Sequence, residues 1–187
     1  MINMILAADE LGSIGFKNGL PWPKLKEDLH WFKQLTEMNV VVMGANTWKS
    51  LGVHAPLTSR HNYVITSSHN KDDFPGCFAV RNPSEDPLEL ILRSLDFQHP
   101  SRDIFVIGGK TLYDEAYQYC DAIFLTKIHD QYPSDTKVDI EKYIDDFVLL
   151  NQMYSQGNQH TPDITFETYL RAGEESDENE WEDDIPF

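Results

Sequence analysis

The chain has 187 residues, which fits one domain of ordinary size with a short appendage, and 41% of them are apolar, enough for a substantial core. Its formal net charge of -16 argues against binding to nucleic-acid phosphates. Residues 174–187 hold eight acids and no base, so half of this charge lies in the last part of the chain.

No apolar run approaches the ~20 residues that span a bilayer, and the first residues show neither a basic leader nor a cleavage site. We therefore expect a cytoplasmic protein without a membrane segment. Cys77 and Cys120 are too few for a disulfide framework and have no metal-ligand spacing. We expect them to be reduced thiols, and the scattered histidines indicate no metal site.

Segments with strand-like and helix-like patterns alternate along the chain. In chain order we expect a strand over Met1–Ala8, a glycine-containing loop over Asp9–Pro23, a helix over Leu25–Glu37, a strand over Asn39–Met43, a short helix over Asn46–Leu51, strands over His61–Thr66 and Cys77–Arg81, a helix over Leu88–Leu95, a strand over Asp103–Ile107, a helix over Thr111–Tyr119, and strands over Ala122–Ile128, Phe147–Tyr154 and Ile164–Leu170.

This alternation predicts an α/β fold with a mixed, mostly parallel sheet flanked by helices, whose closing strands run antiparallel. The apolar periodicity stops at residue 172 and the acidic run follows. We expect one domain over residues 1–172 and a disordered acidic tail over residues 173–187.

Asp28 is the most informative single residue. At about 100° per residue it falls inside the apolar arc of its helix, between Phe32 and Leu35. A carboxylate there must find hydrogen-bond donors, or its pKa rises. An acid in the first turn of a helix also complements the helix dipole, so position alone leaves a structural role open. The preceding loop, rich in glycine and proline and containing Trp22, favours a semi-buried acid beside an active-site lid.

Two glycine turns follow apolar strands: Gly108–Gly109, and Gly44 before a short helix containing Thr47. Glycine lets a ligand approach the backbone closely, and helix N-termini bind phosphate. The glycine pair lacks the spaced glycines of the dinucleotide fingerprint, so a tight turn explains it equally well. Two such turns in one sheet nevertheless indicate a long ligand lying across strand ends.

Together these motifs resemble dihydrofolate reductase over about residues 1–171. The matching segments, in family order, are Ile14–Gly15, Asn18–Trp22, Asp28–Lys33, Val42–Gly44, Thr47–Gly52, Arg60–Asn62, Ser67–Ser68, Val106–Gly109, Tyr113 and Leu125–Thr126. The resemblance implies reduction of dihydrofolate to tetrahydrofolate, with hydride passing from NADPH to pterin C6 and a proton reaching N5. A related pteridine or pyrimidine reductase is the alternative. Arg60 discriminates, because a carboxylate-binding arginine is expected only for a substrate with a glutamyl tail.

The resemblance also implies roles for individual positions. Asp28 would hold the pterin, Thr126 would support Asp28, and water admitted near Leu20 would protonate N5. The expected catalytic residues are Leu20, Trp22, Asp28 and Thr126. The expected substrate contacts are Ile5, Asp28, Phe32, Leu57, Arg60, Ile107 and Thr126. The expected cofactor contacts are Ala7, Ile14, Gly15, Gly44, Ala45, Asn46, Thr47, Thr66, Ser67, Ser68, Arg81, Gly108, Gly109, Lys110, Thr111 and Leu112.

The chain departs from the family where the cofactor's 2′-phosphate is usually bound. Ala45 follows Gly44 where the family often has arginine, and Lys110–Thr111 stands where it often has a basic residue at the helix start. Ser67, Arg81 and Lys110 could compensate. NADPH remains the expected cofactor.

The last five residues, Asp183, Asp184, Ile185, Pro186 and Phe187, resemble the C-terminal tip of bacterial single-stranded DNA-binding protein. The resemblance implies docking to the bacterial replication and repair proteins that bind this tip, with no direct contact to nucleic acid. A phage or mobile element acting in a bacterial host's cytoplasm would fit. The alternatives are a solubilising tail, and an interaction or competitor protein that uses the reductase body as a scaffold.

Overall fold

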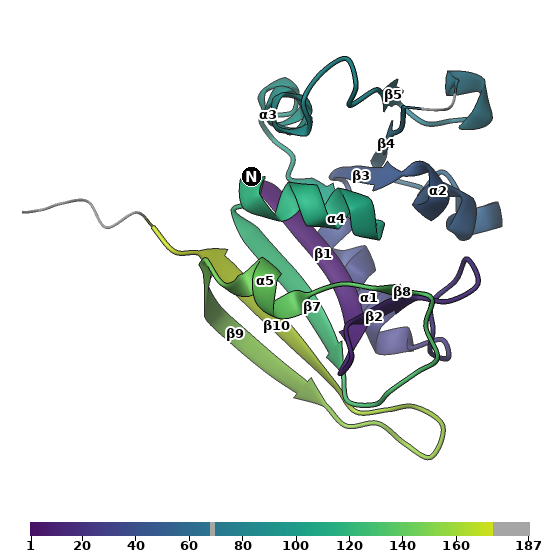
Figure 1. The fold of residues 1–187 in the computed structure, drawn as a ribbon, viewed down its shortest axis with the longest axis vertical. Coiled ribbons are helices and arrows are strands. Elements are labelled where there is room, and N and C mark those ends of the chain that lie inside the picture. Colours follow the sequence, from purple (N-terminus) through teal and green to yellow (C-terminus); the bar gives the residue numbers. More distant parts are fainter. Residues whose placement is uncertain (68–69, 174–187) are drawn as a thin grey trace, which may run out of the picture.

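The computed structural model describes residues 1–67 and 70–173. Its elements (Figure 1) are β1 (Ile2–Asp9), β2 (Ser13–Gly15), α1 (Lys26–Thr36), β3 (Val40–Gly44), α2 (Ala45–Leu51), η1 (Gly52–His54), β4 (His61–Ile65), η2 (Lys71–Asp73), β5 (Ala79–Arg81), α3 (Leu88–Gln98), β6 (Ile104–Val106), α4 (Lys110–Ala116), η3 (Tyr117–Tyr119), β7 (Ala122–Ile128), β8 (Thr136–Lys137), α5 (Ile140–Ile144), β9 (Phe147–Ser155) and β10 (Ile164–Arg171).

One sheet of eight strands organises the molecule, in the order β5-β4-β3-β6-β1-β7-β10-β9. The strands from β5 to β7 in this order pair in parallel, and β10 pairs antiparallel with both β7 and β9. The prediction of a mixed, mostly parallel sheet with antiparallel closing strands is confirmed. The predicted disorder of the tail concerns residues outside the described part of the chain.

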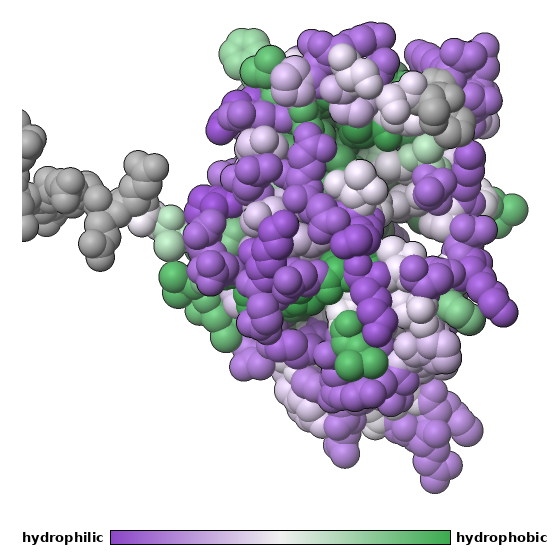
Figure 2. Space-filling model, viewed as in Figure 1, coloured by the Kyte–Doolittle hydropathy of each residue, from purple (hydrophilic) through white to green (hydrophobic). Residues whose placement is uncertain are grey.

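Helices cover both faces of the sheet because its central strands are apolar on both sides. Along β1, Met4 and Leu6 join a core cluster with residues of α3, α4 and α5, whereas Ile5 joins a second cluster with residues of α1 and α2. Alternate residues of a strand point to opposite faces, so a single strand contributes to both clusters. In Figure 1, α4 and α5 lie in front of the sheet and α1 lies behind it. The surface seen in Figure 2 is mostly hydrophilic.

Several short elements were not predicted from the sequence, among them β2, β8 and α5. Strands β2 and β8 form their own two-stranded sheet, in which Ser13 pairs with Lys137 and Gly15 with Thr136. Helix α5 begins after Asp139, whose side chain accepts a hydrogen bond from the backbone N–H of Lys142 at 3.2 Å. Each element is too short for a periodic pattern to be visible.

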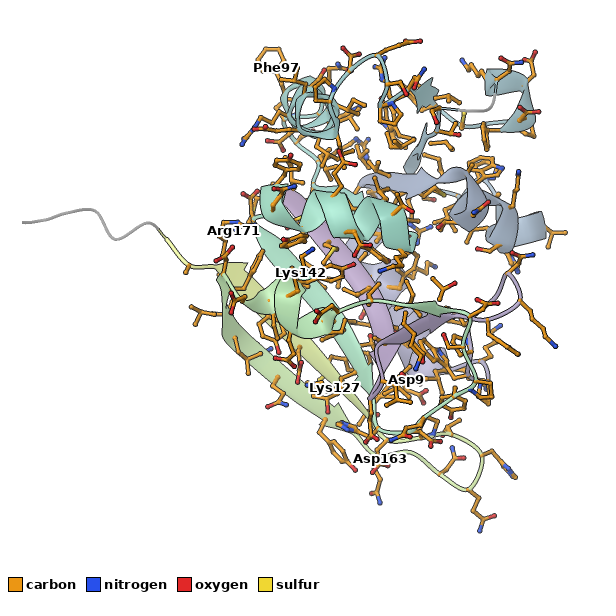
Figure 3. The ribbon with its side chains drawn as sticks, viewed as in Figure 1. Asp9, Phe97, Lys127, Lys142, Asp163 and Arg171 are labelled. Atoms are coloured by element: carbon orange, nitrogen blue, oxygen red, sulfur yellow. The ribbon has the colours of Figure 1, made fainter. Side chains whose placement is uncertain are left out.

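Asp9 fixes the backbone where β1 ends (Figure 3). Its buried carboxylate accepts hydrogen bonds from the backbone N–H groups of Leu11 at 2.9 Å, Ser13 at 2.8 Å and Tyr132 at 2.9 Å. Burial by itself raises the pKa of Asp9, but these hydrogen bonds outweigh it and the pKa lies below its ordinary value. Asp9 therefore ties the beginning of the following loop to the segment before β8.

We predict that Asp9→Ala lowers the free energy of unfolding at pH 7 by about 1–3 kcal/mol, because buried N–H groups lose their acceptor. The folded-state pKa is depressed, so this stabilisation is complete above the unfolded pKa of about 3.9 and disappears as pH falls through the folded pKa. Urea unfolding of both proteins at pH 7 and at several acidic pH values measures it. Asp86→Ala, at an exposed position, is the control. A difference that stays constant into strong acid would contradict the assignment.

Candidate active site

A cleft of about 1060 Å³ opens where the parallel strands end. The carboxyl ends of β1, β3, β4 and β6, the beginnings of α2 and α4, one side of α1 and the loop before Pro21 all contribute to its walls. Ligands of open α/β sheets bind at this edge. The volume is sufficient for a ligand considerably larger than an ordinary drug-sized molecule.

Asp28 supplies the buried charge of the cleft. It lies in the first turn of α1, its residue is only 8% exposed, and it lines the cleft. Burial raises the pKa of Asp28, while a hydrogen bond with the Thr126 side chain acts in the opposite direction. Thr126 lies on β7, next to Ala7 of β1, and is itself buried. The predicted semi-buried acid is therefore present, and its environment favours a ligand that donates hydrogen bonds.

The two glycine turns pack against each other at the floor of the cleft. The N–H of Gly44 donates to the carbonyl oxygen of Gly108 at 2.7 Å, and a Cβ on Gly109 would lie 3.4 Å from the Thr47 hydroxyl oxygen. Gly108 has φ +100°, and a Cβ there would lie 2.8 Å from the ring of Tyr113. A larger residue at Gly108 would have an unfavourable backbone conformation, and its Cβ would clash with the ring of Tyr113. This close packing leaves backbone atoms of both turns at the cleft surface.

Tyr113 was part of the matching motifs but received no predicted role. Its hydroxyl donates to the carbonyl oxygen of Ile5 at 2.8 Å, and the side chain is buried. Burial, together with the nearby charge of Asp28, raises the pKa of Tyr113, so it stays protonated and acts as a donor. It therefore fixes the position of one wall of the cleft.

The loop after β1 forms the outer rim of the cleft. Phe16 and Gly19 exchange backbone hydrogen bonds of 2.9 and 3.0 Å, and the N–H of Lys17 donates to an Asp135 carboxylate oxygen at 2.7 Å. Leu20 lines the cleft and is 53% exposed. Trp22 is instead buried in a cluster with Leu25 and residues of β7 and β10. The loop thus presents Leu20 while Trp22 anchors it.

Most of the predicted site residues meet in this cleft. Those that line it are Ile5, Ala7, Ile14, Gly15, Leu20, Asp28, Phe32, Gly44, Ala45, Asn46, Thr47, Thr66, Ser67, Ile107, Gly109, Lys110, Thr111, Leu112 and Thr126. Five others do not line it, namely Trp22, Leu57, Arg60, Arg81 and Gly108. Ser68 and Asp183, Asp184, Ile185, Pro186 and Phe187 lie outside the described residues.

Three of the residues that do not line the cleft lie close to residues that do. Leu57 packs in the same apolar cluster as Phe32, and the Arg60 guanidinium lies 5.8 Å from the centre of the Phe32 ring. The carbonyl oxygen of Arg81 accepts the N–H of Thr66 at 2.9 Å. Each is therefore one residue behind the lining.

Sequence reasoning missed several lining residues. They include Phe16, Asn18, Leu29, Ser50, His54, Pro83, Tyr113, Glu115, Asp135, Thr136 and Lys137. The position of Leu29 beside Asp28 and the motifs around Asn18 and Ser50 were available signals. Nothing local indicated Asp135–Lys137, because the pairing of β2 with β8 brings this segment to the cleft.

The dihydrofolate reductase family model matches residues 1–171. The dihydrofolate reductase of Bacillus subtilis is 36% identical over 135 residues, which cover 72% of this chain and 73% of the relative. Dihydrofolate reductase type 9 of Escherichia coli is 33% identical over 147 residues, covering 76% and 78%. Dihydrofolate reductase of Enterococcus faecalis, solved as a complex with NADP(H), superposes with TM-score 0.78 and 27% identity, covering 92% of this chain and 97% of that one.

This chain belongs to the dihydrofolate reductase family. The prediction that it is an oxidoreductase of this family is thereby confirmed. No group of histidine, cysteine and acidic side chains suited to a metal occurs among residues 1–67 and 70–173 of this reductase. In the same ranges, none of the helices has the length and apolar character needed to cross a membrane.

We predict that Asp28→Asn raises the free energy of unfolding of this reductase at pH 8 by about 0.5–2 kcal/mol, the usual gain when a strained functional group is relaxed. Above its raised folded-state pKa, the wild-type carboxylate is charged in a desolvated site, which destabilises the native state. As pH falls from the folded pKa toward the unfolded pKa of about 3.9, protonation of Asp28 removes this destabilisation of the wild type. The stability difference between Asp28→Asn and wild type should therefore shrink over this pH range. Urea unfolding across this pH range measures it.

Glu27→Gln is the matched control, since Glu27 is the exposed acid beside Asp28 in the same helical turn. It should show no such gain, because its carboxylate is in water. Equal stability of Asp28→Asn and wild type at pH 8 would show that the buried charge carries no cost.

Proposed function

We propose that this protein reduces 7,8-dihydrofolate to 5,6,7,8-tetrahydrofolate with NADPH, and that its C-terminal residues dock onto bacterial proteins that recognise the tip of single-stranded DNA-binding protein. The observation that carries the reductase assignment is the buried Asp28 carboxylate, supported by Thr126, in a cleft bordered by two glycine turns. Family membership supports the interpretation of this cleft as the active site.

The pterin end of the substrate binds at Asp28. A carboxylate accepts hydrogen bonds from a ring nitrogen and an exocyclic amino group together, and such charge-assisted pairs are strong in a desolvated site. Ile5 and Ile107 line the same region, where their carbonyl oxygens can accept hydrogen bonds from the ring. Phe32 and Leu57 provide the apolar wall for the aminobenzoyl group, and Arg60 pairs with the glutamate carboxylate.

The other half of the cleft fits a reduced dinucleotide. The turns at Gly44 and Gly109 carry no side chain that caps the following helix, so backbone N–H groups are available to phosphate oxygens. Hydroxyl groups of Thr47, Thr66 and Ser67 also lie there. Ala7, Ile14 and Gly15 border the position between this half and Asp28.

When bound, the nicotinamide supplies the hydride that goes to pterin C6. The protein's residues hold the two rings in register and exclude water from most of the cleft. Asp28 orients the pterin through its ring nitrogen and amino group, and a proton reaches N5 from water admitted beside the half-exposed Leu20.

NADPH is favoured over NADH by the cationic side chains near the cofactor half. Lys110 lines the cleft, and the backbone carbonyl of Arg81 bonds with the backbone N–H of Thr66, which also lines it. Ala45 supplies no charge where the family often has arginine, so Lys110, Arg81 and Ser67 carry the recognition of the 2′-phosphate. Lys110 also pairs with Asp114 at 2.9 Å, so its ammonium lies one turn into α4.

We predict that the purified full-length protein oxidises NADPH in a dihydrofolate-dependent reaction that an antifolate blocks. Asp28→Asn should lower kcat at neutral pH roughly 10²-fold or more, because the ring loses its charged partner. Absorbance of the reduced nicotinamide measures the rate, and kcat/KM with NADH should be the lower of the two. Glu27→Gln is the control that should keep wild-type rates. Failure of the wild type to consume either cofactor with dihydrofolate would leave the scaffold alternative and a related pteridine or pyrimidine reductase.

The tail begins far from the cleft. The backbone N–H of Arg171, at the end of β10, donates to the carbonyl oxygen of Asp121 at 2.9 Å, and the N–H of Asp121 donates to Ile2 at 2.7 Å. The end of β10 therefore lies beside the amino ends of β1 and β7, whereas the cleft occupies the carboxyl ends (Figure 1). A partner bound to the last residues need not cover the cleft.

The chemistry of the tail suits capture by a basic pocket. Phe187 offers an aromatic anchor and the C-terminal carboxylate, and the acids that precede it attract a basic rim. Pro186 reduces the conformational freedom lost on binding. Such an interaction weakens as the salt concentration rises, because salt screens the charges. Its proposed partners would place the enzyme in the cytoplasm of a bacterial host, beside replication and repair proteins.

We predict that deleting Phe187 weakens binding to a bacterial exonuclease or repair factor that recognises this tip by about tenfold or more, because the anchor and the position of the carboxylate are both lost. Titration by fluorescence anisotropy of full-length and shortened protein measures this effect. The reductase rate of the shortened protein, which should be unchanged, is the internal control. Unchanged affinity after the deletion would refute specific docking.

A further inference from the structure

The Arg60 side chain is held from one side by the end of α1. Thr36, the last residue of α1, is fully buried with 0% exposure, and its hydroxyl oxygen accepts a hydrogen bond from Nε of Arg60 at 2.8 Å. A second bond joins an Nη of Arg60 to the carbonyl oxygen of Thr58 at 2.8 Å. The guanidinium also lies over the ring of Phe32, 5.8 Å from its centre. These contacts define both the position and the plane of the guanidinium.

The Thr36 hydroxyl has only one arrangement that satisfies both of its neighbours. It donates its single hydrogen to the carbonyl oxygen of Phe32 at 2.7 Å. A lone pair therefore faces Nε of Arg60, which can only donate. The helix end thus fixes the acceptor for Arg60, and the buried environment keeps water from replacing it.

Arg60 lacks an acidic partner within the described residues. No ion pair found there includes it, although Lys33, Arg93, Lys110, Lys127 and Arg171 each have one. Burial lowers the pKa of Arg60, with the nearby charge of Glu37 opposing this effect, so the cation is partly desolvated. Its bonds to Thr36 and Thr58 use Nε and one terminal hydrogen, which leaves the far edge of the fork for a carboxylate.

We propose that Thr36 is a positioning residue for the carboxylate end of the substrate: its hydroxyl holds the Arg60 guanidinium in the plane that a bidentate carboxylate requires. The inference rests on the proposed pairing of Arg60 with the glutamyl carboxylate. Arginine loses much side-chain freedom when it binds in a fork. With Thr36 in place, the Arg60 side chain loses this conformational freedom when the protein folds. Without the Thr36 hydroxyl, the same conformational entropy is lost when the substrate binds, which weakens binding.

The test compares Thr36→Val with Thr36→Ser in the full-length protein. Valine keeps the volume but removes the acceptor, whereas serine retains it. We expect Thr36→Val to raise KM for dihydrofolate about tenfold, equivalent to about 1.4 kcal/mol, and Thr36→Ser to stay within about twofold of wild type. A reduced pterin without the glutamyl tail, 6-methyl-7,8-dihydropterin, should show no change in KM with either variant.

Thr165→Val is the matched control. Thr165 is also buried, and its hydroxyl oxygen lies 2.6 Å from Nε2 of His129, so the substitution removes a comparable buried contact elsewhere on the sheet. Its KM values should equal those of wild type for both substrates. Thermal unfolding of each variant confirms folding, and Thr36→Ala replaces Thr36→Val if the latter does not fold.

Arg60→Gln separates the inference from the function on which it rests. If Arg60→Gln leaves KM for dihydrofolate unchanged, the proposed carboxylate contact is wrong. If Arg60→Gln raises that KM and Thr36→Val does not, the contact stands and the positioning role of Thr36 is overturned. An equal rise for the tailed and tailless substrates in Thr36→Val would show a general structural effect and would also overturn it.

Discussion

The interaction on which this molecule depends is the contact between the Asp28 carboxylate and the Thr126 side chain, both of which are buried at the wall of the cleft. Burying an acid is unfavourable unless it finds donors, and Thr126 supplies one. The sheet order makes this contact possible, because β7 pairs with β1 and places Thr126 beside Ala7 at the cleft. The Asp28 carboxylate can accept further hydrogen bonds, which a flat, donor-rich heterocycle can supply. The desolvated carboxylate lowers the stability of the free protein, and ligand binding recovers that stability.

The second constraint is that an acidic chain must accommodate an anionic cofactor. Few cations line the cleft, and the half that we propose for the cofactor is built instead from glycine turns and hydroxyl groups. The turns at Gly44 and Gly108 pack backbone against backbone, 2.7 Å apart at their hydrogen bond. Such packing presents fixed N–H dipoles, which attract phosphate without the net positive charge that arginine would bring.

The cleft and the end of β10 lie at opposite edges of the sheet, which is compatible with both proposed activities. The cleft occupies the carboxyl ends of the parallel strands, while β10 ends beside their amino ends. The length of the central strands therefore separates the cleft from the end of β10.

The sequence by itself determined the alternation of strands and helices, the placement of Asp28 on an apolar helix face and the two glycine turns, because these are local patterns repeated within a few residues. Only the tertiary structure decided that Trp22 is an anchor rather than a cleft residue, that the Arg60 guanidinium lies over the Phe32 ring, and that Asp135 holds the rim loop. The last contact arises from β2–β8 pairing across more than a hundred residues. A local pattern carries no information on which distant segments meet, since that depends on how the whole sheet closes.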